Sequence, residues 1–135
     1  MAFKMILLLR RKQGLSPEEF REGYENFHSR IGVRLYGHLW TEYRRNYLKA
    51  GSSFTQTRAG GSSGPDDIGF DAVSEFIVRD EAAWAEMSRI SAANQALIQE
   101  DEARWFDQVH SYIVPCDTIE EDLSPAAIEE LRARG

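Results

Sequence analysis

Several features are scarce in this sequence, and each scarcity excludes a class of protein. Among 135 residues there is one cysteine, Cys116, so no disulfide can form within the chain. The longest apolar run, Met5 to Leu9, is too short to span a bilayer and lacks the cleavage-site pattern of a signal peptide. Basic residues number 16 against 22 acidic ones, and the net charge of −6 argues against a nucleic-acid partner. We therefore expect a cytoplasmic protein with no nucleic-acid or membrane partner.

Motifs that bind metals or cofactors are also missing. The three histidines, His28, His38 and His110, show none of the HxH, HxxxH or HExxH spacings of metal sites. The sequence contains no GxGxxG fingerprint of a dinucleotide site and no GxSxG nucleophile elbow. Cys116 has no histidine or basic neighbour that would activate its thiol. The sequence thus predicts chemistry that needs neither a cofactor nor a metal.

The most informative stretch is an amphipathic helix that begins after Ser16. Ser16 can act as N-cap, Pro17 then occupies the first helical position, and Glu19 can close a capping box. His28 lies on the apolar face of this helix, four residues after Tyr24. That face is predicted to consist of Phe20, Tyr24, Phe27, Ile31 and Leu35. A titratable side chain is therefore expected among aromatic packing.

The order of the elements predicts an α+β fold of the ferredoxin-like, split βαβ kind, with a four-stranded antiparallel sheet. Strands are predicted at residues 3–9, 39–48, 70–78 and 108–114, and helices at about 17–35, after Asp80, and at about 92–104. The end of the last helix, 99–104, is polar and expected to be exposed. Helices on one face leave an apolar sheet face that needs cover, which predicts a homodimer with two sheets face to face.

Two segments stand apart from this pattern by composition. Residues 50–69 are rich in glycine and serine without periodicity, so we expect a mobile loop that gates a pocket. Residues 117–135 begin with acidic residues and are predicted to form a tail that ends in a short helix from Pro125. The expected domain therefore covers residues 1–116.

The sequence resembles the EthD family of dimeric α+β barrel proteins. The matching pieces are KMILLLRRKQGLSPEEFREGYENFHSRI, YRRNYL, FDAVSEFIV and EDEARWFD. The resemblance implies a small, apolar, carbonyl-bearing substrate, polyketide-like or aromatic, held inside each barrel without a cofactor. It implies a cyclase, dehydratase, decarboxylase or isomerase; the alternatives are a cofactor-independent monooxygenase of phenolic substrates and a non-catalytic carrier or sensor of a small ligand.

Two residues are the candidate catalytic groups. Spacing alone favours a core histidine at His28, but the resembling family carries a histidine at this helix position, which favours proton transfer. Tyr43, in the matching Tyr-x-Arg-Asn pattern, could stabilise an enolate oxygen or could be a packed strand aromatic. Strand alternation assigns Arg45 to the face of Tyr43, and Trp40 and Asn46 to the other face. The predicted substrate-binding residues are Tyr24, Trp40, Arg45, Asn46, Phe76, His110 and Tyr112.

Overall fold

The computed structural model describes residues 1–49, 54–55, 62–63 and 68–135 of the chain. Four strands form one antiparallel sheet in the order β2-β5-β1-β6. They are β1 (Phe3–Leu9), β2 (Trp40–Tyr47), β5 (Ala72–Val78) and β6 (Tyr112–Cys116). The short strands β3 (Phe54–Thr55) and β4 (Ser62–Ser63) pair with each other. Of the expected mobile loop, residues 50–53, 56–61 and 64–67 lie outside the described residues.

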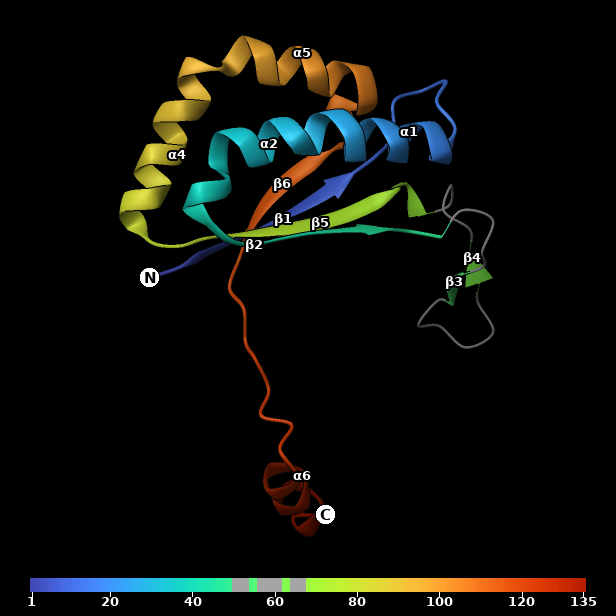
Figure 1. Ribbon diagram of the computed structural model, residues 1–135. Helices are drawn as coiled ribbons and strands as arrows, with labels where there is room; N and C mark the ends of the chain where they lie inside the picture. Colours follow the sequence, from blue (N-terminus) through green and yellow to red (C-terminus); the bar gives the residue numbers. More distant parts are fainter. Residues whose placement is uncertain (50–53, 56–61, 64–67) are drawn as a thin grey trace.

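The helices lie on one side of this sheet (Figure 1). They are α1 (Pro17–Gly23), α2 (Ser29–Tyr36), α4 (Glu81–Ala93) and α5 (Gln95–Trp105), while α6 (Pro125–Ala133) lies at the end of the C-terminal segment. The ferredoxin-like architecture predicted from the element order is therefore confirmed. The last strand begins later than predicted, because Gln108–His110 forms a 3₁₀ turn rather than the start of a strand.

The first helix starts as its sequence predicts. The Ser16 side chain accepts a hydrogen bond from the Glu19 amide at 3.1 Å, and the Glu19 carboxylate accepts one from the Ser16 amide at 3.0 Å. Between α1 and α2 the residues Tyr24–His28 form a π-helical turn, in which the Ser29 amide bonds the carbonyl of Tyr24 five residues earlier. This turn inserts one extra residue into the helical repeat.

The extra residue changes which side chains of α2 face the sheet. Phe20 and Tyr24 are buried as predicted, but Phe27 is 53% exposed. The residues that line the interior are His28, Gly32 and Tyr36, each one position after the predicted Phe27, Ile31 and Leu35. Beyond Tyr24 the predicted face was therefore correct at His28 but wrong at Phe27, Ile31 and Leu35, because an uninterrupted 3.6-residue repeat was assumed.

A second irregularity lies at the start of β2. The pairing of β2 with β5 shifts between Trp40 and Glu42, which marks a β-bulge. The bulge directs Trp40 to the same face as Tyr43; the Trp40 ring stacks on Phe76 with centroids 4.6 Å apart. The prediction that Trp40 and Tyr43 occupy opposite faces of this strand was wrong for that reason.

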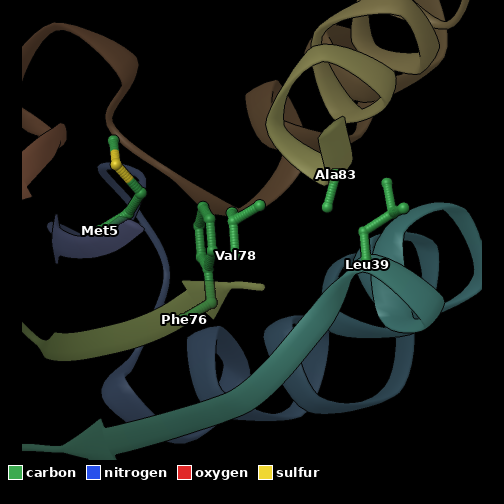
Figure 2. Close-up of a cluster of buried hydrophobic side chains, with 5 residues drawn as sticks. All are labelled: Met5, Leu39, Phe76, Val78 and Ala83. Atoms are coloured by element: carbon green, nitrogen blue, oxygen red, sulfur yellow. The ribbon is translucent and has the colours of Figure 1, made fainter. Parts of the chain in front are cut away.

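Two clusters of buried apolar side chains fill the space between sheet and helices. Figure 2 shows one of them, formed by Met5, Leu39, Phe76, Val78 and Ala83. The other consists of Leu9, Phe20, Tyr24, Ala72 and Phe106. Gly23 lets α1 and α5 approach closely, since a Cβ at this position would lie 2.1 Å from the Trp105 ring. The core thus fixes α1 and the π turn against α5.

The opposite face of the sheet carries no helix within the described part of the chain (Figure 1). Cross-strand register assigns the alternate residues of the two central strands to this open face, where Lys4 pairs with Glu75 at 3.3 Å. Its apolar side chains are Ile6, Leu8, Val73, Ile77, Tyr112 and Val114. None of the described helices has the length and apolar character needed to cross a membrane.

Candidate functional site

A cavity of about 270 Å³ lies between the helices and the covered face of the sheet. Helices α2, α4 and α5 and all four strands of the sheet contribute to it. Its apolar lining consists of Leu7, Trp40, Phe76, Met87, Ile98 and Ile113. Its polar lining includes Tyr24, His28, Tyr36, Tyr43, Ser91 and Glu102. A mostly apolar pocket with a few convergent polar groups is the usual form of a small-molecule site.

His28 enters this cavity from the π turn and is paired with a carboxylate. Its Nδ1 lies 2.8 Å from Oδ2 of Asp101 on α5, and Asp101 is only 5% exposed. The other ring nitrogen, Nε2, lies 3.9 Å from Oε1 of Glu102. The edge-on ring of Phe106, with its centroid 5.0 Å from that of the imidazole, restricts the histidine further. A buried carboxylate on Nδ1 holds the imidazole with Nε2 available for proton exchange.

Asp101 was missed by the sequence analysis. The predicted exposure of residues 99–104 is wrong at this position, because the turn of α5 that carries Asp101 packs against the π turn. Asp101 also lies 3.7 Å from the guanidinium of Arg104. No periodic signal identifies such a residue, since a carboxylate in a polar run is ordinarily solvated.

Tyr43 ends a chain of three hydroxyl groups that runs into the core. Its hydroxyl donates to Tyr24 at 2.9 Å, and the Tyr24 hydroxyl donates to Ser74 at 2.9 Å. Burial raises the pKa of Tyr24 and of Tyr43 above the usual range, so both phenols stay protonated. Each hydroxyl can donate and accept, so the chain can also run from Ser74 outward, which frees the Tyr43 hydrogen for a ligand oxygen.

Arg45 and Asn46 do not line the cavity, although both were predicted to bind substrate. Arg45 donates to both carboxylate oxygens of Glu25, at 2.6 and 2.7 Å, and Tyr47 donates to the same carboxylate. These bonds, with that of Arg45 first, lower the pKa of Glu25 to about 2. Asn46 donates to the Val73 carbonyl across the strand pair. The Arg45–Glu25 pair joins β2 to the π turn that carries His28, and so helps to hold that turn against the sheet.

His110 and Tyr112 also lie away from the cavity. His110 belongs to the 3₁₀ turn and pairs with Asp107 at 2.9 Å, in a separate cavity lined by Arg10 and Lys12. Tyr112 pairs in register with Leu8 and shares the open face of the sheet. The structure therefore brings together His28, Tyr43, Tyr24, Trp40 and Phe76 among the predicted residues, and separates the other four.

The cavity also holds polar groups that were not predicted as site residues. The Tyr36 hydroxyl lies 2.6 Å from that of Ser91 on α4. Gln95 and Gln99 on α5 also line the cavity. Burial raises the pKa of Tyr36. Among the residues that the structure describes, no cluster of three histidine, cysteine or carboxylate side chains could hold a metal ion. A ligand would therefore meet hydroxyl, amide and imidazole groups and the Glu102 carboxylate on otherwise apolar walls.

Comparisons with known proteins agree with this architecture. The fold is similar to that of a protein from Arabidopsis thaliana, with a TM-score of 0.53 and 15% identity over 90% of this chain and 99% of the other. It is also similar to an EthD-like protein from Ralstonia eutropha, with a TM-score of 0.53 and 19% identity over 92% of this chain and 94% of the other. No match was found among curated proteins. The EthD domain matches residues 12–109, which is most of the chain, and the chain therefore belongs to the EthD family.

Proposed function

We propose that this protein is a cofactor-free enzyme that moves a proton next to the carbonyl of a small apolar substrate. The observation that carries the proposal is the His28–Asp101 pair at the wall of a mostly apolar cavity that Tyr43 also lines. The reaction class is that of cyclases, dehydratases, decarboxylases and isomerases, which share an enolate-like intermediate. A polyketide-like or aromatic substrate fits the stacked Trp40 and Phe76 rings beside these groups.

In the proposed mechanism His28 is the general base. With Nδ1–H donated to the Asp101 carboxylate, the lone pair on Nε2 takes the proton from the carbon beside the carbonyl. The imidazolium that forms is stabilised by the buried carboxylate. The same proton then returns to carbon in an isomerase, or to a leaving hydroxyl in a dehydratase. His28 thus serves as base and acid in one turnover.

Tyr43 is proposed to stabilise the negative oxygen. The raised pKa of the phenol keeps it a donor at any pH at which His28 can act as base. Reversal of the hydroxyl chain, with Ser74 donating to Tyr24 and Tyr24 to Tyr43, would strengthen the Tyr43 donor as charge builds on the oxygen. Such a donor contributes mainly in the transition state.

We also propose that the enzyme is a homodimer in which the open sheet faces of two protomers pack together. The support is the apolar surface of that face, which the described helices leave uncovered. The cavity lies on the other side of the sheet, so dimerisation would leave it accessible.

The test is deuterium exchange at the carbon beside the carbonyl, followed by NMR in D₂O under nitrogen. The probes are small aryl ketones and cyclic monoketones, whose uncatalysed exchange is slow at neutral pH. His28→Ala should slow the catalysed exchange by at least ~10²-fold and Tyr43→Phe by about 10-fold to 10²-fold. His38→Ala and Tyr112→Phe are matched controls at positions outside the cavity and should leave the rate unchanged.

The alternatives give different results in the same assay. Consumption of a phenolic probe only when oxygen is admitted would identify a monooxygenase. Tight binding of a probe with no exchange and no turnover would identify a carrier or sensor. Full exchange in His28→Ala would remove His28 from the mechanism.

A further inference from the structure

The C-terminal helix α6 has no partner in its own protomer. Figure 1 shows it at the end of an extended segment, on the side of the sheet opposite to α2 and α5. No residue of α6 is buried, and Leu123 and Leu131 are 72% and 60% exposed. A helix of nine residues is marginal by itself in water, so its stability requires packing against another surface.

The sequence of α6 is nevertheless that of a docking helix. The Ser124 side chain caps it by accepting from the Ala127 amide, and Pro125 occupies the first position. Ile128 and Leu131 are three residues apart and share one face, and Leu123 stands in the N′ position that packs beside Ile128. Residues 117–135 also carry six carboxylates and two arginines, so this C-terminal arm is acidic overall.

A groove of about 290 Å³ lies between α5 on one side and the π turn and α2 on the other. Its apolar side chains are Phe27, Ile31 and Leu97, of which Phe27 and Leu97 are 53% and 45% exposed. Three arginines, Arg30, Arg34 and Arg104, line it together with the carboxylates of Glu100 and Asp101, which leaves an excess of one positive charge. Apolar residues together with guanidinium groups are what an acidic amphipathic helix would bind.

We propose that α6 of one protomer docks in this groove of its partner. The inference rests on the homodimer proposed above, in which the partner occupies the side of the sheet toward which the arm extends. The eight residues 117–124 can span roughly 26 Å, at about 3.3 Å per residue. Facing sheets lie about 10 Å apart and a helix is about 10 Å across, so this reach brings α6 to the level of the partner's helices.

The docked arm would lie against the active site of the partner. Asp101 both lines the groove and holds His28, and Arg104 in the groove lies 3.7 Å from Asp101. The EthD match ends at residue 109, so the arm lies outside the matched residues, as β6 does. It would join the two protomers without entering either cavity.

Cross-linking of the full chain tests the proposal. In a Cys116→Ser background, one chain carries Leu97→Cys and a second carries Ile128→Cys, and the two are mixed and treated with a short flexible bismaleimide. A covalent heterodimer is expected on a denaturing gel only in the mixture. The matched control replaces Ile128→Cys by Glu130→Cys, which lies about 200° away around α6 at 100° per residue and should cross-link at least ~5-fold less.

A chain that carries both Leu97→Cys and Ile128→Cys distinguishes the other occupants. An intramolecular product that runs as a compact monomer would show that the arm binds its own groove. Equal yields from Ile128→Cys and Glu130→Cys, or no product from a chain that sediments as a dimer, would show that the groove does not bind α6.

Removal of residues 117–135 gives an independent readout. The dimer dissociation constant should rise at least ~10-fold, while deuterium exchange per assembled dimer is retained. Unchanged dimer affinity would overturn the docked arm. Loss of exchange in His28→Ala bears on the proposed enzyme alone, so the two failures are distinguishable.

Discussion

Asp101 differs from the other acidic residues of α5 because the helix turn that carries it packs against the π turn. Its carboxylate is buried and bonded to Nδ1 of His28 at 2.8 Å, whereas Glu100 beside it is exposed. A buried carboxylate with a single imidazole partner fixes the tautomer of that imidazole and stabilises its charged form. In the proposed mechanism Asp101 is therefore a positioning residue that acts through His28.

The first prediction concerns Asp101→Asn. An amide at this position can donate to Nδ1 and stabilise the wrong tautomer, so kcat/KM should fall roughly 10²–10³-fold, mostly in kcat. Isotope exchange and steady-state kinetics measure the split, and a thermal melt checks the fold. Glu100→Gln is the matched control. A rate for Asp101→Asn within a factor of two of wild type would show that the pair has no catalytic role.

The second prediction concerns the Glu25–Arg45 pair. Its hydrogen bonds from Arg45 lower the pKa of Glu25 from 4.5 to about 2 in the folded protein. Because the folded value is depressed, this contribution to stability is present above about pH 4.5 and is lost as the pH falls toward 2. The carboxylate is about a third exposed, so solvent screening reduces the contribution to about 1 kcal/mol.

Urea unfolding of wild type and Glu25→Gln between pH 7 and pH 2.5 measures this contribution. The stability difference between the two should be largest at pH 7 and should shrink as the pH falls. Glu22→Gln, an exposed carboxylate in the preceding turn, is the control and should show no such convergence. A difference that is constant with pH would contradict the linkage.

At the scale of the elements, the regular parts were predictable and the irregular parts were not. β1 was predicted over 3–9 and spans Phe3–Leu9, because a short, mainly aliphatic run that ends at charged residues has the length of a strand and not of a helix. The π turn and the β-bulge each add one residue, and periodicity arguments assume that no residue is added. The spacing of residues therefore could not show that Trp40 and Tyr43 share one face of β2, or which face of α2 is directed inward.

The third prediction follows from the π turn. Deletion of Asn26, which is exposed within that turn, should convert Tyr24–His28 to regular α-helix. His28, Gly32 and Tyr36 then occupy positions that a 3.6-residue repeat directs inward, so the protein should fold and melt within a few degrees of wild type. Deletion of the exposed Glu22 is the control. It rotates Tyr24 by about 100° relative to Phe20 and should be strongly destabilising.

Thermal melts and far-UV circular dichroism compare the two deletions. Equal destabilisation by both would show that the π turn is required for the fold. The catalysed exchange is a separate measure, since the shorter Tyr24–His28 spacing alters the approach of the imidazole to Asp101. Loss of rate in a stable Asn26 deletion would indicate that the extra residue serves the site and not the core.

At the scale of the whole molecule, the two faces of the sheet have different roles. The covered face carries the cavity and the core, and its inward residues could be predicted once the strands were aligned. The open face carries the apolar side chains of β1, β5 and β6, with Glu75 in its middle, where it pairs with Lys4 and Arg44. A sheet face of this composition is stable in water when another apolar surface covers it.

The last prediction is that the open face forms the dimer interface. The wild type should sediment at micromolar concentration with twice the protomer mass of 15.4 kDa. Val73 pairs with Leu8 on the open face, so Val73→Lys should bury a charge in the interface and raise the dissociation constant at least ~10²-fold. Val109→Lys makes the same change at a residue that is 78% exposed off this face and should leave the dimer intact. Sedimentation of all three proteins across a concentration series measures the dimer dissociation constants. A wild type that stays at 15.4 kDa would show that the open face does not form a dimer. A Val73→Lys variant that dimerises as tightly as Val109→Lys would show that the open face binds another partner.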